Sequence, residues 1–352
     1  MTLNSSYISI EGRRIAVDEP PYIVAEVSAN HNGNLETARK LIEAAKKSGA
    51  NAVKLQTYKP DTITIDCDAK DFLIQGGLWN GRTLYDLYGE AHTPWEWHAP
   101  LFEFARKIGI TIFSSPFDTT AVDLLENLNA PAYKIASFEL VDLPLIKYVA
   151  ATRKPMILST GMANVDEIQE ALDTAREGGC QELSILHCVS GYPAPAEDYN
   201  LRVIPDLIER FGLVTGLSDH TLGNTTAITS IAMGASIIEK HFTLDRNGGG
   251  PDDSFSLEPK DLENLCQDTK VAWRSLGYAN YDNKKSEQEN IKFRRSLYVV
   301  HDIKAGEIIT KENVKSIRPG FGLPPKFLDQ VIGKTASIDL NKGKPLTLDD
   351  LE

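Results

Sequence analysis

Short apolar runs alternate along the chain with longer segments of helical periodicity. The first run lies at residues 22–26 (YIVAE). After it, apolar residues from Leu35 to Ala45 recur at the spacing of one helix face, so a helix is expected there with Asn34 as its N-cap. Gly49 should end this helix. Seven further apolar runs follow, at residues 52–56, 110–114, 132–135, 156–159, 183–188, 214–218 and 237–241.

These eight strand candidates are mostly separated by helical segments, such as residues 166–177 and 225–233. Such alternation indicates a parallel sheet, because each helix carries the chain back to the start of the next strand. Eight strand–helix repeats over about 250 residues have the usual size of a closed barrel. The pattern therefore predicts an α/β fold, a (β/α)8 TIM barrel, with a doubly wound open sheet as the alternative.

One connection is much longer than the others. Between the second and third expected strands, residues 66–97 form an insertion rich in glycine and aromatic residues, with the core GGLWNGRTLYDLYGEAHTPWEWH. A connection of this length in a compact domain usually has a function. The alternative is a surface insertion with a helix packed on the barrel, and part of the segment is expected to be that.

The C-terminal part of the chain has a different pattern. We expect a barrel domain at residues 1–278, a polar linker at 279–293 and a small domain at 294–352. The last segment has short alternating runs (SLYVV, GEIIT, KSIRP, KPLTL) divided by glycine and proline, which predicts a mostly β structure. At about 60 residues it is near the lower limit for independent stability, so docking on the barrel or on a partner chain would help it.

Composition and charge limit the class of protein. The chain has 352 residues, of which 42% are hydrophobic and 24% charged, the balance of a soluble globular protein. Its formal net charge of −12 argues against non-specific binding to nucleic acid, which requires a basic surface. A local group of lysines and arginines could still bind an anionic substrate.

The ends and the cysteines indicate a cytoplasmic protein. The N-terminal sequence MTLNSSYISIEGRR lacks the pattern of a signal peptide, and no apolar run reaches the roughly 18 residues needed to cross a membrane. The four cysteines lie far apart and form no C-x-x-C pair, so they are expected to be reduced thiols. No membrane or nucleic-acid partner is expected.

Polar residues stand at the carboxyl end of nearly every expected strand. The active site of a β/α barrel lies on that face, so their position favours a functional role. Any one of them could instead fill the barrel interior, but their repeated occurrence at the same end indicates a shared site. They include Glu26, Asn30, Lys54, Gln56, Ser115, Lys134, Ser137, Ser159, His187, Ser190, Tyr192, Ser218, His220, Glu239 and His241.

Two kinds of chemistry follow from this set. Two lysines and four serines suit a phosphate and a carboxylate, which accept many charge-assisted hydrogen bonds. A lysine inside an apolar strand would be costly to bury without an anion. The residues are Lys54, Lys134, Ser115, Ser137, Ser159 and Ser218.

The second chemistry is metal binding. His220 and His241 follow or end the seventh and eighth expected strands, which are neighbours in a barrel. Two imidazoles so placed could share one divalent ion and leave positions open for water and substrate, although either could be a hydrogen-bonded core histidine. The glycine run at residues 248–250 lacks the Lys-Ser/Thr of a phosphate-binding loop, and a flexible loop that closes over substrate is expected there.

The strand-end motifs resemble those of the sialic acid synthase family. The matching stretches are IVAEVSANHNG, NAVKLQTY, FSSPFD, AYKIASFE, ILSTGMA, LHCVSGYPAP, GLSDHTLG and IEKHFTLD. The segment RRSLYVVHDIKAGEIITKENVKSIRPGFGLPP resembles the small antifreeze-like (SAF) domain of that family. The resemblance covers almost the whole chain. It implies a condensation of phosphoenolpyruvate with an amino-sugar aldehyde.

Within that family, the insertion and the stretch SIRPGFGLPPKFLDQVIGK most resemble the pseudaminic acid synthases. This implies that 2,4-diacetamido-2,4,6-trideoxy-L-altrose and phosphoenolpyruvate give pseudaminic acid and phosphate. N-acetylneuraminate or legionaminate synthesis from another amino sugar is the alternative. Ser190 stands where sialic acid synthases tend to have asparagine, which weakens transfer at that position and fits a different sugar.

The resemblance also implies roles for single residues. Glu26 would be the acid/base or a metal-linked carboxylate, and His220 and His241 would take part in catalysis and bind manganese, magnesium or cobalt. Arg318 would reach the active site of the other subunit in a domain-swapped homodimer. Asn30, Tyr192 and Asp252 would contact the sugar, while phosphoenolpyruvate would be held by Lys54, Ser115, Lys134, Ser137, Ser159, Ser218 and Arg318.

Two rival functions remain from the residues. A sugar-phosphate aldolase on the same barrel would need Lys54 or Lys134 with a lowered pKa, to form a Schiff base. A carbohydrate- or ice-binding protein would use the small domain beside an inactive barrel. The complete set of a glutamate, lysines, serines and histidines at the strand ends argues against the second.

Overall fold

A computed structural model describes residues 6–352 of the chain. The chain divides into two compact units, with the division between Gly277 and Tyr278. Each unit is described by itself below. The linker limits expected from the sequence, at residues 279–293, remain a prediction.

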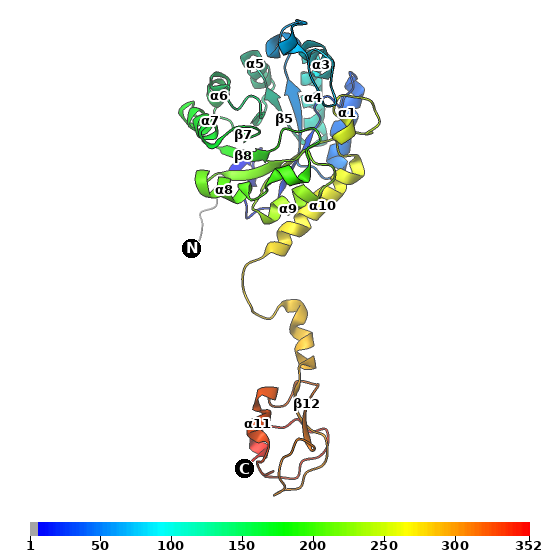
Figure 1. Ribbon diagram of the computed structural model, residues 1–352, viewed down its shortest axis with the longest axis vertical. Helices are drawn as coiled ribbons and strands as arrows, with labels where there is room; N and C mark the ends of the chain where they lie inside the picture. The colour runs from blue at the N-terminus through cyan, green and yellow to red at the C-terminus, as the bar shows by residue number, and fades with distance from the viewer. Residues whose placement is uncertain (1–5) are drawn as a thin grey trace. The chain divides into compact units, whose positions relative to one another are not determined.

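Eight parallel strands form a closed barrel in the first unit, in which β10 pairs with β3 and so joins the last strand to the first. Figure 1 shows the strands inside a ring of helices. The predicted TIM barrel is thereby confirmed, and five of the eight strands have the predicted ends. The strands are β3 (Tyr22–Glu26), β4 (Ala52–Thr57), β5 (Thr111–Pro116), β6 (Tyr133–Ile135), β7 (Met156–Ser159), β8 (Leu183–Cys188), β9 (Val214–Ser218) and β10 (Ile237–His241).

The outer helices pack their apolar faces on the strands. In α1 (Leu35–Lys47), Ala38, Leu41, Ile42 and Ala45 are buried, and the Asn34 side chain accepts hydrogen bonds from two backbone N–H groups of the first turn, as predicted. Apolar burial of this kind is the main source of stability for such helices. The others are α4 (Trp95–Ile108), α5 (Thr119–Asn127), α6 (Leu143–Ala150), α7 (Val165–Glu177), α8 (Val203–Phe211), α9 (Thr225–Ala232) and α10 (Pro259–Leu276).

An N-terminal hairpin closes the end of the barrel opposite the polar strand ends. Strands β1 (Ile8–Ile10) and β2 (Arg13–Ile15) pair antiparallel. Ile8, Ile10 and Ile15 pack in one buried cluster with residues near the strand starts, such as Tyr22 and Ile237. Because this end is filled by apolar side chains, solvent and substrates reach the barrel interior from the other end.

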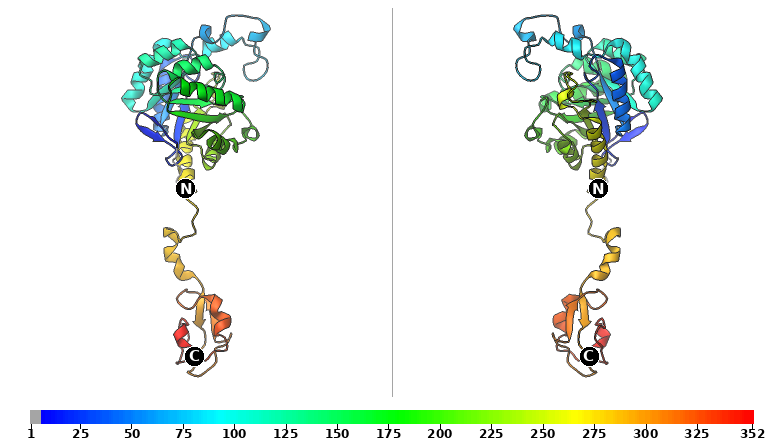
Figure 2. Two further views of the ribbon diagram at one scale, coloured as in Figure 1. Left: turned by 90° about the vertical axis from the view of Figure 1, so that its left-hand side faces the viewer. Right: turned by 90° about the vertical axis from the view of Figure 1, so that its right-hand side faces the viewer.

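The insertion after β4 contains α2 (Pro60–Ile63), a short 3-10 turn at Lys70–Phe72 and α3 (Leu84–Ala91). Figure 2 shows the part before α3 as a loop that extends from the barrel. Buried Tyr58 contacts Tyr88 of α3 at a ring-centroid distance of 5.8 Å and Phe117 at 5.1 Å. The expected helix packed on the barrel is therefore present, and aromatic contacts fix it there.

The second unit has a small core of its own. It contains the antiparallel pair β11 (Ser296–Val299) and β12 (Val314–Ile317), a short α11 (Leu328–Val331), and a 3-10 helix at Lys285–Phe293 within the expected linker. The expected runs GEIIT and KPLTL make isolated bridges instead of strands. Its core consists of Leu297, Val299, Ile303, Ile309, Val314, Val331, Ala336, Leu340 and Leu346. Among residues 6–352, no helix is long and apolar enough to cross a membrane.

Candidate active site

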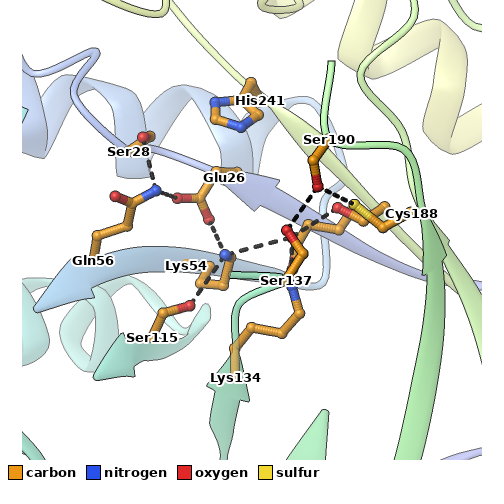
Figure 3. Close-up of polar contacts among 12 residues, drawn as sticks. Glu26, Ser28, Lys54, Gln56, Ser115, Lys134, Ser137, Cys188, Ser190 and His241 are labelled. Atoms are coloured by element: carbon orange, nitrogen blue, oxygen red, sulfur yellow. Dashed lines mark hydrogen bonds and ion pairs between the residues drawn. The ribbon is translucent and has the colours of Figure 1, made fainter. Parts of the chain in front are cut away.

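Lys54 lies at the centre of a buried polar cluster at the carboxyl ends of the strands. Its Nζ atom lies 2.9 Å from Glu26 Oε2 and 3.4 Å from Glu239 Oε1, and it donates a hydrogen bond of 3.3 Å to Ser115 Oγ. Figure 3 shows Glu26, Lys54 and Ser115 converging from neighbouring strands. The parallel register explains the meeting, because Lys54 pairs with Glu26. The structure thus brings together residues that lie far apart in the sequence.

Glu239 of β10 is the second carboxylate of the cluster. Its Oε1 lies 2.9 Å from Lys134 Nζ and accepts a hydrogen bond of 3.2 Å from Ser218 Oγ. Burial opposes ionisation of Glu239, but Lys134 and Lys54 outweigh it and lower its pKa to about 2. The sequence analysis named Glu239 among the strand-end residues but gave it no role, although it shares its strand and, two residues apart, its face with His241.

The two buried lysines differ in their surroundings. Lys54 contacts both carboxylates, which overcome its burial and raise its pKa. Lys134 contacts Glu239 alone, and burial lowers its pKa despite that partner. With Glu26 and Glu239 ionised, two positive charges face two negative charges, so the cluster is electrically balanced.

A chain of hydrogen bonds leads from Glu26 to Asp252. Gln56 Nε2 donates to Glu26 Oε1 at 3.1 Å and to Ser28 Oγ at 2.9 Å, and Ser28 Oγ donates to Asp252 Oδ2 at 2.6 Å. Burial raises the pKa of Glu26, an effect that Lys54 opposes, and burial also raises the pKa of Asp252. Asp252, expected to contact the sugar, is therefore tied to Glu26 through Gln56, which the sequence analysis placed at a strand end without a role, and Ser28, which it did not name.

Several polar atoms of the site lack a hydrogen-bond partner although they are buried. Among them are Ser159 Oγ, Glu239 Oε2 and His241 Nδ1. Unpaired buried polar atoms are rare in folded proteins because each costs about 1–3 kcal/mol. Their gathering at one end of the barrel is typical of a site that binds a polar ligand. Nearby, Ser137 Oγ lies 2.9 Å from Ser190 Oγ.

His220 and His241 lie side by side, with ring centroids 5.4 Å apart. The Nδ1 atom of His220 lies 2.8 Å from the carbonyl oxygen of Val189, so Nδ1 carries the proton and Nε2 has a free lone pair. Burial lowers the pKa of His220 to about 4 and that of His241 well below its usual range, so both rings are neutral at pH 7. Neutral imidazoles with free nitrogen atoms fit a divalent metal ion.

The pair is not extended by a third strong ligand. In the described part of the chain, no group of three or more histidines, cysteines and acidic residues is arranged to hold a metal ion. Asp252 Oδ2 lies 3.7 Å from His241 Nδ1. A metal here would be held by His220 and His241, with water and substrate at the remaining positions.

The predicted sugar-contact residues lie in different places. Tyr192 packs on His220 with ring centroids 4.4 Å apart, so it stands next to the histidine pair. Asn30 donates hydrogen bonds to the Phe242 carbonyl oxygen and to Ser256 Oγ, which hold the loop after β10, while its Oδ1 atom has no partner. Arg318 is exposed in the second unit at the end of β12. Roles for these residues in binding substrate remain predictions.

The glycine-rich loop after β10 is anchored, although the sequence predicts a flexible one. The Asp253 carboxylate accepts hydrogen bonds from the Gly250 N–H at 2.8 Å, from Asn32 Nδ2 at 3.0 Å and from Thr243 Oγ1 at 2.5 Å. A Cβ atom at Gly250 would collide with the Asn32 side chain. The loop therefore holds Asp252 in place next to His241.

Gly250→Ala is expected to lower the free energy of unfolding by about 1–3 kcal/mol and to raise KM for the sugar, because the loop must move away from Asn32. Chemical unfolding and steady-state kinetics would measure both. Gly249→Ala is the control: φ is +83° there and nothing lies within 4 Å of the new Cβ, so only backbone strain of about 1 kcal/mol is expected. Equal effects of both variants would contradict this role for the Asn32 contact.

Glu139 is a further acidic residue near the cluster. It follows Ser137 in the loop after β6, its Oε2 atom is buried without a partner, and burial raises its pKa from 4.5 to about 7. A carboxyl group that exchanges its proton near neutral pH is suited to general acid–base catalysis. The resembling motif AYKIASFE contains this residue, but the predicted set stopped at Ser137.

Glu139→Gln is expected to stabilise the protein at pH 8 by up to about 3 kcal/mol and to reduce turnover. Because the folded pKa of about 7 exceeds 4.5, the folded state binds the Glu139 proton more tightly. Ionisation therefore destabilises the fold above pH 7, and this penalty is absent below pH 4.5. Unfolding midpoints across this range would show a difference that grows with pH. Glu177→Gln at the exposed end of α7 is the control, and a pH-independent difference for Glu139→Gln would contradict the assignment.

Comparisons with known proteins identify the family to which the chain belongs. Residues 41–281 match the NeuB family and residues 294–352 match the SAF domain. The chain is 46% identical to the pseudaminic acid synthase of Helicobacter pylori over 95% of this chain and 98% of that protein. It is 40% identical to the N,N'-diacetyllegionaminic acid synthase of Campylobacter jejuni, over 90% of this chain and 95% of that protein.

The fold has a solved counterpart. The crystal structure of N-acetylneuraminic acid synthetase from Leptospira borgpetersenii matches with a TM-score of 0.73 and 31% identity, over 82% of this chain and 96% of that chain. The resemblance predicted from the strand-end motifs and the small domain is confirmed. The chain is a member of the NeuB family, with a SAF domain at its C-terminal end.

Proposed function

We propose that this protein condenses phosphoenolpyruvate with 2,4-diacetamido-2,4,6-trideoxy-L-altrose and water, and releases pseudaminic acid and phosphate. The observation that carries the proposal is the buried lysine–serine cluster beside the histidine pair, in a chain that is 46% identical to a pseudaminic acid synthase along nearly its full length. The cluster suits the anionic substrate, and the histidine pair suits a carbonyl substrate.

Because the cluster carries no net charge, we infer that an anionic substrate is bound with the help of positive charge from outside the cluster. Lys54 and Lys134 are already paired with Glu26 and Glu239, so a bound phosphate and carboxylate would bring excess negative charge into a buried space. Additional positive charge is needed there. A divalent ion on His220 and His241 would supply part of it, and Arg318 would supply more.

The reaction joins C3 of phosphoenolpyruvate to the aldehyde carbon of the open-chain sugar. Manganese, magnesium or cobalt, when bound, would polarise the aldehyde as a Lewis acid. Lys54 and Lys134 hold the phosphate and stabilise its charge throughout. Ser115, Ser137, Ser159 and Ser218 donate hydrogen bonds to the substrate anions, and Ser159 has a hydroxyl free to do so.

Proton transfer is assigned to the carboxylates. Glu26, with its pKa raised by burial, is placed to exchange a proton near the reacting carbons, and Glu139 is the second candidate. Water adds to C2 of the former phosphoenolpyruvate, and the tetrahedral intermediate expels phosphate by cleavage of the C–O bond. Gln56 and Ser28 keep Glu26 oriented through both steps.

A substrate panel tests the proposal. Phosphate release would be measured with phosphoenolpyruvate, manganese and one of three sugars: the altrose derivative, the legionaminic acid precursor or N-acetylmannosamine. The altrose derivative should give the highest kcat/KM. A preference for the legionaminic precursor, favoured by the 40% identity to a synthase of that kind, would overturn the sugar assignment. No phosphate release with any sugar would overturn the condensation itself.

The lowered pKa of Lys134 favours one other reaction, a Schiff-base aldolase. Borohydride reduction in the presence of pyruvate separates the two mechanisms. A condensing synthase should give no covalent adduct on Lys134 or Lys54, and an adduct found by mass spectrometry would support the aldolase instead.

We infer that the protein works as a domain-swapped homodimer in which Arg318 enters the partner's site. Exposed apolar residues on both units support an interface, among them Phe138 (58% exposed) and Met162 (61%) after the barrel strands, and Phe321 (65%) close to Arg318. Sedimentation of the full chain would give the oligomeric state.

Arg318→Ala should raise KM for phosphoenolpyruvate by about tenfold or more, with a smaller change in kcat, because a charge-assisted contact to the anion is lost. Steady-state kinetics with varied phosphoenolpyruvate would measure it. Lys315→Ala, an exposed cation of β12 three residues before Arg318, is the matched control. A fully active protein truncated after Gly277 would rule out this role.

A further inference from the structure

A cavity of about 230 Å³ lies between the insertion after β4 and the loop after β10, and it has no part in the reaction described above. One wall comes from the insertion after β4, with Trp79, Arg82 and Glu90. The other comes from the loop after β10, with Pro251 and Ser254. The cavity therefore joins two segments that are far apart in the sequence, and each is attached to the carboxyl end of a barrel strand.

Trp79 connects this cavity to the active site. Its indole Nε1 donates a hydrogen bond of 3.1 Å to the Pro251 carbonyl oxygen, and its ring centroid lies 6.0 Å from that of Tyr192. Tyr192 in turn packs on His220. Trp79 is therefore separated from the histidine pair by a single side chain, that of Tyr192.

Both walls are held in place by hydrogen bonds. In the insertion, the Ile74 N–H donates to the Arg82 carbonyl oxygen and the Gly81 N–H donates to the Ile74 carbonyl oxygen, both at 2.9 Å. These bonds and the bridge between Leu73 and Thr83 make the segment that carries Trp79 a closed loop. The opposite wall is fixed by Asp253. Such a cavity is largely formed before a ligand arrives.

The charges of the cavity indicate the kind of ligand. Arg82 and Glu90 lie 2.6 Å apart and neutralise each other, so the cavity carries no excess charge for a phosphate or carboxylate. The indole offers an apolar surface, and the exposed Ser254 hydroxyl and nearby backbone groups offer hydrogen bonds. A small neutral group with an apolar end and an amide fits this combination.

We propose that Trp79 is a specificity-determining residue and that this cavity receives an acetamido group of the sugar, with the methyl group on the indole. The inference rests on the proposed function. Phosphoenolpyruvate occupies the lysine side of the site, so the sugar lies on the side of Tyr192 and Trp79. Its substituents remote from the aldehyde then extend toward the insertion.

Trp79→Ala in the full-length protein tests this proposal. KM for the diacetamido sugar should rise at least about tenfold, as is typical when an apolar pocket loses its main contact, while KM for phosphoenolpyruvate should change less than about twofold. Preference for the diacetamido sugar over N-acetylmannosamine should fall. Trp79→Phe should recover part of the affinity, because it keeps an aromatic surface. Ile65→Ala, an exposed apolar residue of the same insertion, is the matched control and should behave as wild type.

Other outcomes would overturn the proposal. Equal KM changes for both substrates, or a loss confined to kcat, would mean that Trp79 only supports the fold of the loop. If Trp79→Ala does not fold, Trp79→Phe decides: the sugar should quench tryptophan fluorescence in the wild type and less in this variant, and equal quenching would contradict contact with the indole. If the wild type itself rejects the altrose derivative, the proposed function fails. The same comparison with the sugar it accepts then tests Trp79 separately.

Discussion

His220→Ala and His241→Ala should each lower metal-dependent turnover by about a thousandfold or more, which corresponds to roughly 4 kcal/mol of lost transition-state stabilisation. The two rings are the only neutral imidazole pair that the described residues place at the carboxyl ends of β9 and β10. A single remaining imidazole would bind a divalent ion weakly. Phosphate release after chelation and addition of manganese would measure the loss, and metal content per chain would be measured in parallel.

The fold should survive both substitutions. His187 provides the matched control, because it is a buried histidine of the neighbouring strand β8 whose Nε2 atom contacts the Tyr199 carbonyl oxygen instead of the site. His187→Gln should keep its dependence on manganese. If both alanine variants retain full activity and the same response to chelator, His220 and His241 do not form the metal site.

Lys54→Met should lower kcat/KM for phosphoenolpyruvate by about a thousandfold and the free energy of unfolding by about 3–5 kcal/mol. The substitution removes the cation that lies between Glu26 and Glu239, so two buried carboxylates are left with Lys134 alone. Steady-state kinetics and urea unfolding would separate the two effects.

The double variant Lys54→Met/Glu26→Gln distinguishes charge balance from substrate binding. Removal of both partners restores the balance of charge, so most of the lost stability should return. Activity should not return, because the phosphate still lacks its lysine. Recovery of activity together with stability would show that Lys54 only stabilises the fold and does not bind the phosphate.

The barrel could be predicted because buried parallel strands have a plain signature. In β3, all five residues from Tyr22 to Glu26 are buried, and a run of this kind stands out between amphipathic helices. Strand ends then placed Lys54, Lys134, Ser218 and the two histidines on one face. Their position at the strand ends is sufficient to predict that these residues share a site.

Which side chains contact each other within the site depends on the register of the barrel strands, and the sequence does not reveal that register. Glu239 faces Lys134 and Lys54 only because closure of the barrel pairs β10 with β9 and β3 at a fixed offset. Glu139 gains its raised pKa from the way its loop packs, and Trp79 lies in a segment without periodicity. Such contacts come from tertiary structure, so local patterns carry little signal for them.

One missed element did leave a signal. The N-terminal hairpin turns at Glu11 and Gly12, both with positive φ; β1 alternates apolar and polar residues, and β2 ends in the apolar Ile15. The sequence ISIEGRRI therefore contains a recognisable two-residue turn. Short strands outside the eightfold repeat are hard to recognise, because the repeat dominates the pattern of apolar residues.

This hairpin has a consequence for synthesis of the protein in the cell. Ile8, Ile10 and Ile15 are translated before all eight barrel strands, yet their apolar neighbours include Val214 and Ile237 near the other end of the barrel sequence. The apolar cluster at this end of the barrel cannot form completely until those strands have been synthesised, so the three isoleucines remain exposed while the barrel is translated. Nascent chains that stall before β10 are therefore expected to be prone to aggregation and to depend on chaperones.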